Sequence, residues 1–258
     1  MSDERKKIGL ALSGGGIRAA AHIGMLKFLE EKNIRPDIIA GNSAGAIVAV
    51  LYAAGKKPEE ILEIFQKVKL FDFSNIAWDE PGLLDTDEYM EAFEEYLEPE
   101  SFEELDIQIR IAAADILEGK LKIFDSGPLI KTMLASSALP GIFSPVDIGQ
   151  SLYQDGGLFN NFPADVIRES CNYLIGMNVN PLNAVKKENL TDTLDIIGRA
   201  LELFIGRQSN KNRECCDLYI SPMRLVEFGI FNQEKIEDAF EIGYEESRKL
   251  ADRFERLM

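Results

Sequence analysis

The chain has 258 residues, 46% of them hydrophobic and 28% charged, with a formal net charge of −16. This composition describes a soluble globular protein, long enough for one large α/β domain or two small ones. The negative charge excludes nucleic-acid binding, because phosphate contacts need a basic face. It also disfavours electrostatic docking on anionic lipid, so any transient contact with a membrane surface has to be local and apolar.

The N-terminal part of the chain alternates buried strands with helices. Apolar runs predict strands at residues 7–13 and 38–40 and helices at 18–32, 44–54 and 58–68. Pro58 and the two glutamates after it are typical of a first helical turn. No repeat or Gly/Ser/Pro-rich linker marks a boundary, so we expect a single domain over residues 1–258.

Residues 70–105 differ from their surroundings because they are acidic and aromatic at once. An apolar, loop-like stretch precedes an expected helix at residues 87–96. Loops of this length are often functional. Two interpretations stay open: a helical excursion that covers one sheet edge, or a lid over an apolar pocket.

The rest of the chain predicts more strands and three more helices. The strands are expected at 107–116 and 120–124 as an antiparallel pair, in a hairpin that turns at Gly149 and Gln150, and at 173–179 and 217–222. The helices are expected at 127–139, ended by Pro140, at 191–208, and at 232–254 with an amphipathic pattern.

The termini and the cysteines indicate where the protein works. The apolar run after the charged N-terminus is too short for a signal peptide or a membrane span, so we expect a cytoplasmic protein. Cys171, Cys215 and Cys216 are odd in number, and one histidine is too few to complete an ordinary zinc site with them. We expect reduced, mostly buried thiols, with no metal and no cofactor.

Ser43 lies between Gly41 and Gly45 in a G-x-S-x-G pattern, where an apolar strand passes into an alanine-rich helix. Such a tight turn lifts the serine hydroxyl clear of the sheet and places it at a helix N-terminus. The amides and dipole there favour developing negative charge. The alternative is that Ser43 only caps the helix.

Gly14, Gly15 and Gly16 follow the first predicted strand. The stretch Gly14 to Ala19 fits the dinucleotide fingerprint, but Gly41 and Asn42 occupy the place where that fingerprint expects an acid. The other use of consecutive amides is an oxyanion hole serving Ser43. Two readings of Arg18 stay open: it orients this loop or contacts an anionic headgroup, or it is a surface cation paired with a carboxylate.

A catalytic serine needs a base, and the sequence offers two candidates. The single histidine, His22, lies among alanines and large apolar residues and has the pattern of a packed side chain. Asp155 precedes Gly156 and Gly157 at the end of a strand, where the backbone is free to approach another loop. Partial burial would raise its basicity. The alternative for Asp155 is a turn-forming role only.

The stretches SGGGIRAAAHIG, GNSAGA and QDGGLFNN, in this order, resemble the patatin-like phospholipase family of lipid acyl hydrolases, above all its small bacterial members and the catalytic domain of neuropathy target esterase. ASSALPGIFSPV and NNFPADV extend the resemblance over nearly the whole chain. It implies a three-layer α/β/α fold with a mixed, mainly parallel central sheet. It also implies a dyad of Ser43 and Asp155, with Gly14, Gly15, Gly16 and Arg18 as the oxyanion loop. Asn42 stands where many members have threonine, a departure outside the dyad.

These residues predict a serine hydrolase that cleaves fatty-acyl esters of a lipid or a simple ester through an acyl-Ser43 intermediate. The alternative from another class is a non-catalytic lipid-binding or regulatory protein that keeps the pocket.

Overall fold

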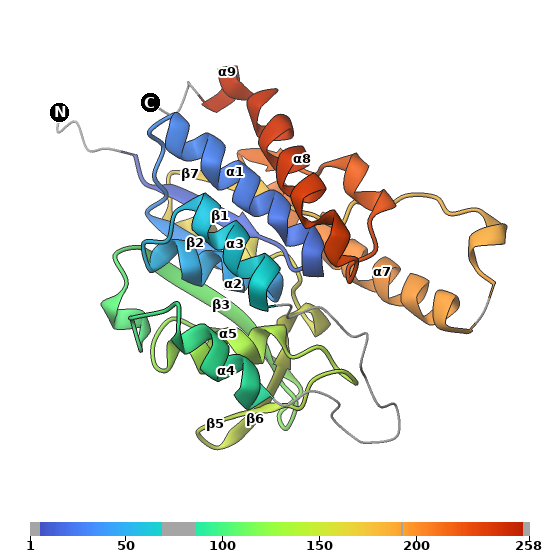
Figure 1. Cartoon of the computed structure of the whole chain (residues 1–258), viewed down its shortest axis with the longest axis horizontal. Helices are drawn as coiled ribbons and strands as arrows, with labels where there is room; N and C mark the ends of the chain where they lie inside the picture. The colour runs from blue at the N-terminus through green and yellow to red at the C-terminus, as the bar shows by residue number, and fades with distance from the viewer. Residues whose placement is uncertain (1–5, 69–85, 192, 255–258) are drawn as a thin grey trace.

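The computed structural model describes residues 6–68, 86–191 and 193–254, and within them eight strands form one sheet (Figure 1). The strands are β1 (Ile8–Leu12), β2 (Ile38–Asn42), β3 (Gln108–Asp115), β4 (Lys120–Phe124), β5 (Val146–Ile148), β6 (Ser151–Asp155), β7 (Tyr173–Met177) and β8 (Leu218–Ile220). Their order across the sheet is β5-β6-β3-β2-β1-β7-β8, with β4 paired to β3 off this path.

The sheet is mixed and mainly parallel, as predicted. Strands β3, β2, β1, β7 and β8 run parallel to one another, because the connections between them cross over through helices. Strands β4 and β6 pair with β3 in the antiparallel sense, and β5 pairs with β6 as the expected hairpin. The carboxyl ends of the five parallel strands therefore lie along one edge of the sheet.

The helices confirm the alternation predicted from the sequence, with boundaries moved by a few residues. They are α1 (Ala20–Glu31), α2 (Ala44–Ala53), α3 (Pro58–Val68), α4 (Thr86–Glu94), α5 (Leu129–Ser137), α6 (Ala164–Ile167), α7 (Thr193–Asn212), α8 (Ile236–Arg248) and α9 (Ala251–Phe254). The expected first helix begins instead as a 3-10 turn, η1 (Gly16–Ala19). The expected last helix ends at Arg248, and α9 follows it.

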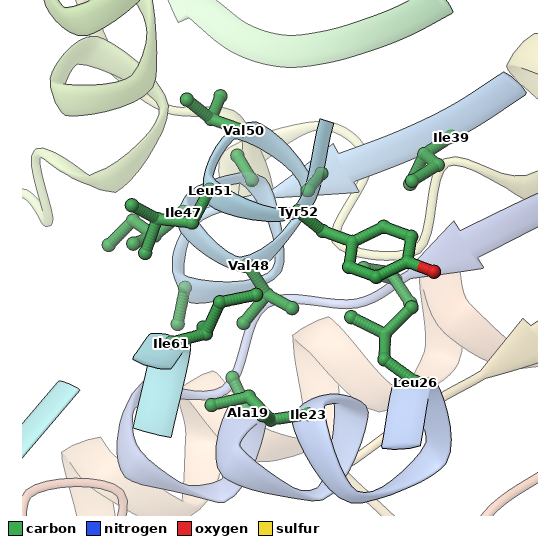
Figure 2. Close-up of a cluster of buried hydrophobic side chains, with 14 of the residues drawn as sticks. Ala19, Ile23, Leu26, Ile39, Ile47, Val48, Val50, Leu51, Tyr52 and Ile61 are labelled. Carbon is green, nitrogen blue, oxygen red and sulfur yellow. The ribbon is translucent and has the colours of Figure 1, made fainter. Parts of the chain in front are cut away.

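One face of the sheet carries the main core. Helices α1, α2, α3, α5 and α8 pack there, and α1 lies along α8 (Figure 1). Helix α2 is buried along its whole length because its ten residues are all alanine, glycine, tyrosine or aliphatic. Figure 2 shows Val48 and Leu51 of α2 among Ile23 of α1, Ile39 of β2 and Ile61 of α3. Such all-round burial holds the N-terminus of α2 rigidly against the sheet.

The opposite face has a thinner cover, which completes the predicted three-layer architecture. Ala11, Ala40 and Leu174 point to this side and pack with Phe162 and helix α6. The three cysteines lie at the margin of this second core and are free thiols, as expected. They are half-buried rather than mostly buried, so that part of the prediction is wrong.

The predicted lid at residues 70–105 lies partly outside the described residues, which resume at Thr86. Helix α4 packs on α5, and the rings of Tyr89 and Phe143 meet edge to face at 5.6 Å. A lid role stays a prediction. No helix in the described part of the chain combines the length and the apolar character needed to cross a membrane.

Candidate active site

The turn between β2 and α2 has a backbone conformation that few residues adopt. Ser43 has φ 52° and ψ −131°, in the left-handed half of the map. A Cβ on Gly41 would lie 2.7 Å from the Cα of Ala46, and one on Gly45 would lie 2.5 Å from the carbonyl oxygen of Ser13. Only glycine fits at positions 41 and 45, which explains the G-x-S-x-G spacing seen in the sequence.

Ser43 does not cap the helix it precedes. Its side chain makes no capping hydrogen bond, so the simpler interpretation of this serine is wrong. Its backbone amide donates instead to the hydroxyl oxygen of Ser136, at 2.9 Å. Ser136 lies in α5 and is fully buried. This hydrogen bond from α5 fixes the turn at Ser43 between β2 and α2, which we call the elbow. The Ser43 hydroxyl is left for another partner.

Strand register brings Asp155 to the level of Ser43. Asn42, the last residue of β2, lies opposite Ala112 of β3, and the next residue, Ala113, lies opposite Asp155 of β6. The chain then crosses over β3, and a Cβ on Gly156 would collide with the carbonyl of Ala112 and the side chain of Asn42. The glycine therefore permits the close approach that the sequence suggested.

The Asp155 carboxylate is buried, with 5% of its surface exposed, and lies beside Ser43. Burial raises the pKa of this carboxyl above its ordinary value, because the charged form loses water. Hydrogen-bonding interactions with the Ser43 side chain, the Gly157 amide and Asn42 oppose that rise in pKa. The Ser43 side chain is one of the hydrogen-bonding partners of this carboxylate, so the hydroxyl and the candidate base are in contact.

Two donors orient the carboxylate. The amide of Gly157 donates to Asp155 Oδ1 at 2.7 Å, so Asp155 does form the turn contact expected of an aspartate before glycine. Asn42 Nδ2 donates to the same oxygen at 3.1 Å and to Asn161 Oδ1 at 3.1 Å. Both bonds end on Oδ1 and therefore fix the rotation of the carboxylate.

Asn42 and Ser136 have positions in the site that sequence reasoning missed. The resemblance places Asn42 outside the dyad, yet its side-chain amide donates directly to the candidate base, Asp155. Ser136 gave no signal beyond its place in ASSALPGIFSPV. No local pattern points to either contact, because 113 residues separate the partners in the first and 93 in the second.

The glycine-rich loop after β1 lies against the serine. A Cβ on Gly14 would lie 2.9 Å from the Cβ of Ser43, so a side chain there would displace the serine. The Gly14 amide already donates to the carbonyl of Asn161 at 3.1 Å. Within the described chain, the amides of Gly15 and Gly16 have no acceptor, and Ala44 and Gly45 begin α2 with free amides. These four amides are the candidate oxyanion donors.

Arg18 is buried rather than a surface cation, which corrects one of its two interpretations. Its Nε donates to the carbonyl of Phe228 at 2.7 Å, and Nη2 lies 4.0 Å from Glu202 of α7. Burial lowers the pKa of the guanidinium, and Glu202 opposes that effect. Ile17 donates its amide to Ile230. Arg18 therefore fastens the loop to the segment before α8.

His22 is a packed histidine, as its surroundings in the sequence indicated. It is fully buried, and Nε2 donates to the carbonyl of Ser13 at 2.8 Å. Desolvation lowers its pKa from 6.5 to about 4, so the ring is neutral at pH 7. Nε2 is occupied by Ser13, and Nδ1 is buried with no hydrogen-bond partner among the described residues, so neither ring nitrogen is bonded to Ser43 and Asp155 is the remaining candidate.

The buried His22 predicts a pH dependence of stability. The pKa of His22 is lower in the folded protein than in the unfolded chain. The contribution of this residue to the unfolding free energy is therefore fully present above pH 6.5 and is lost as the pH drops toward about 4. The loss from this residue should reach about 3 kcal/mol. Guanidinium unfolding of the wild type and of His22→Gln is measured across this pH range. The difference between their unfolding free energies isolates the contribution of His22, since all other groups titrate in both proteins. Parallel curves would contradict the buried, neutral ring.

Comparisons with known proteins show the family of the chain. A family model described as patatin-like phospholipase matches residues 10–168. An NTE family protein of Mycobacterium bovis is 34% identical over 162 residues, covering 61% of this chain and 44% of that protein. The lysophospholipase NTE1 of Candida glabrata is 29% identical over 182 residues, covering 67% of this chain and 10% of that protein. The chain thus spans less than half the length of these relatives.

A solved structure resembles the fold over most of the chain. The crystal structure of VipD from Legionella pneumophila superposes with a TM-score of 0.59, covering 96% of this chain and 67% of that one. The sequences are only 15% identical, so this likeness concerns the arrangement of helices and strands.

Proposed function

This chain belongs to the patatin-like phospholipase family, a family of lipid hydrolases, and we propose that it cleaves fatty-acyl esters through Ser43 and Asp155. The observation that carries the proposal is their meeting. A serine on a strained elbow lies beside a buried carboxylate that comes from 112 positions further along the chain. The elbow and the close approach at Gly156 both bring these two side chains together.

In the acylation step, Asp155 accepts the proton of the Ser43 hydroxyl while Oγ attacks the ester carbonyl carbon. The carbonyl oxygen gains the negative charge. We assign its stabilisation to the amides of Gly15, Gly16, Ala44 and Gly45, in line with the macrodipole of α2. The C–O bond of the ester then breaks, the protonated Asp155 returns its proton to the leaving alcohol, and acyl-Ser43 remains.

Deacylation repeats these roles with water as the nucleophile. Asp155 takes a proton from water, the hydroxide attacks the acyl carbon, and Oγ leaves with the proton that Asp155 returns. An ordinary aspartate is a weak proton acceptor at neutral pH. The burial that raises the pKa of Asp155 makes it a better base. Asn42 and the Gly157 amide hold it in position without fully cancelling that rise.

We assign the substrate to lipid esters, because the matching family is one of phospholipases and one relative is named a lysophospholipase. We place the protein in the cytoplasm, with transient and local contact with lipid surfaces. The proposal needs no metal or cofactor.

A fluorophosphonate probe tests the proposal, because Oγ of an activated serine displaces its fluoride and becomes phosphonylated. The folded protein should be labelled at Ser43 alone, found by mass spectrometry of the peptides, and should hydrolyse a soluble short-chain chromogenic ester. Ser13 and Ser136 serve as internal controls, since both lie close to the elbow but face other partners. Heat-unfolded protein should not be labelled at all.

The opposite outcome identifies the alternative function. If folded protein binds lipid but takes no label at Ser43 and releases no acid from any ester, the chain is a non-catalytic lipid-binding protein that keeps the family pocket.

A further inference from the structure

Three chain segments are fastened to the glycine-rich loop beside Ser43. The first contains Asn161, whose carbonyl accepts from Gly14, and the second contains Asn180, whose side chain donates to the carbonyl of Gly14. The third contains Phe228 and Ile230, whose carbonyls accept from Arg18 and Ile17. All three are therefore bonded to the loop whose Gly14 lies against Ser43.

Helix α7 is tied to the same loop, because Glu202 of this helix lies 4.0 Å from Arg18. Large apolar side chains are exposed on the first and third segments and on α7: Leu158 and Phe159, Met223 and Phe231, and Ile196 and Leu203. Single exposed leucines need no explanation, but several exposed apolar side chains on elements that contact one loop indicate an interaction surface.

Helix α7 gives the clearest part of this surface. Ile196 is 58% exposed and Leu203 is 49% exposed. They are seven residues apart with exposed Ala200 between them, so all three lie on one face of the helix. The stripe continues into the exposed side chains of Arg207 and Lys211. Figure 1 shows α7, in orange, at the side of the molecule, beyond the end of α8.

Charge favours a lipid as the occupant of this face. The chain as a whole has a net charge of −16, yet residues 178–213 contain six Lys or Arg and only four Asp or Glu. An apolar stripe that ends in cations matches the acyl region and the phosphates of a phospholipid surface. The rest of the acidic protein would be held away from it.

We propose that α7 and the exposed side chains around it dock on phospholipid surfaces, with Ile196 and Leu203 entering the interface and Arg207 and Lys211 meeting lipid phosphates. This inference rests on the proposed function, because a lipid ester has to leave its membrane to reach Ser43. Because Glu202 of α7 lies 4.0 Å from Arg18, docking by this face brings the glycine-rich loop toward the lipid. It supplies apolar binding that the negative charge of the whole chain does not.

The test uses vesicles of ether-linked phosphatidylcholine, which contain no ester to hydrolyse. The full chain should float with these vesicles, and the double variant Ile196→Ser with Leu203→Ser should bind them about tenfold less. Hydrolysis of a soluble short-chain ester should be unchanged in the double variant, since neither side chain touches the dyad. The matched control is Leu117→Ser, a 62% exposed leucine in the turn after β3, which should leave both measurements unchanged.

Three outcomes would overturn the inference: no flotation of the wild type, equal flotation of the double variant, or equal loss in Leu117→Ser. A wild type that elutes as a dimer and ignores vesicles, with a monomeric double variant, would assign the face to a second copy of this chain. Failure of the proposed function is distinct, because it would abolish soluble-ester hydrolysis and leave vesicle binding intact.

Discussion

Replacement of Ser43 by alanine is expected to abolish ester hydrolysis, with a fall in kcat of at least about a thousandfold. The expectation follows from the proposed acyl-serine intermediate, which cannot form without Oγ. Binding should persist, because the glycine loop and the apolar surroundings are unchanged. A chromogenic ester assay measures kcat, and equilibrium binding of a non-hydrolysable ether analogue measures affinity.

A second substitution at the same position separates chemistry from folding. Ser43 has φ 52°, which costs free energy for any residue with a Cβ. Ser43→Gly should therefore be inactive like Ser43→Ala. Its free energy of unfolding in guanidinium should be higher than that of Ser43→Ala by about 1 kcal/mol. Activity in either variant would remove Ser43 from the mechanism. Equal stability of the two would show that the elbow is not strained.

The elbow was predictable because its chemistry is local. Gly41, Ser43 and Gly45 lie within five residues of one another. Each glycine is required because a Cβ at its position would collide with backbone atoms packed against the turn. The order of strand and helix around it follows from apolar runs of different length and period. The predicted parallel core and the antiparallel additions are confirmed for the same reason.

The partners of the elbow were less predictable because they depend on the register between strands. The contact of Asn42 with Asp155 requires β2, β3 and β6 to pair in one alignment, and no single stretch of sequence carries that information. The occupied amide of Gly14 is a similar case. The consecutive glycines predict amide donors for an oxyanion. The Gly14 amide, however, donates to the carbonyl of Asn161, which lies 147 positions further along the chain.

Replacement of Asp155 by asparagine is expected to lower kcat by about 10²- to 10⁴-fold, the usual contribution of a general base. The amide is nearly the same size as the carboxylate, and its oxygen can still accept from Gly157 and Asn42. The fold and substrate binding should therefore persist, with KM little changed. What the variant loses is a group that can take the proton from Ser43.

The pH dependence of the wild type gives an independent measure of the same residue. Because burial raises the pKa of Asp155, the acid side of the pH profile of kcat/KM should lie above the ordinary aspartate value of 3.8. Activity falls as the pH drops through that pKa, since the protonated carboxyl is no longer a base. In Asp155→Asn the residual rate should not show this step.

The matched control is Asp165→Asn, an exposed aspartate ten residues further along that accepts from Asn160 and Asn212. It changes the same charge in the same part of the chain without touching Ser43, so kcat and the pH profile should match those of the wild type. Full activity in Asp155→Asn would exclude the carboxylate as the base. An equal loss in both variants would attribute the effect to net charge rather than to proton transfer.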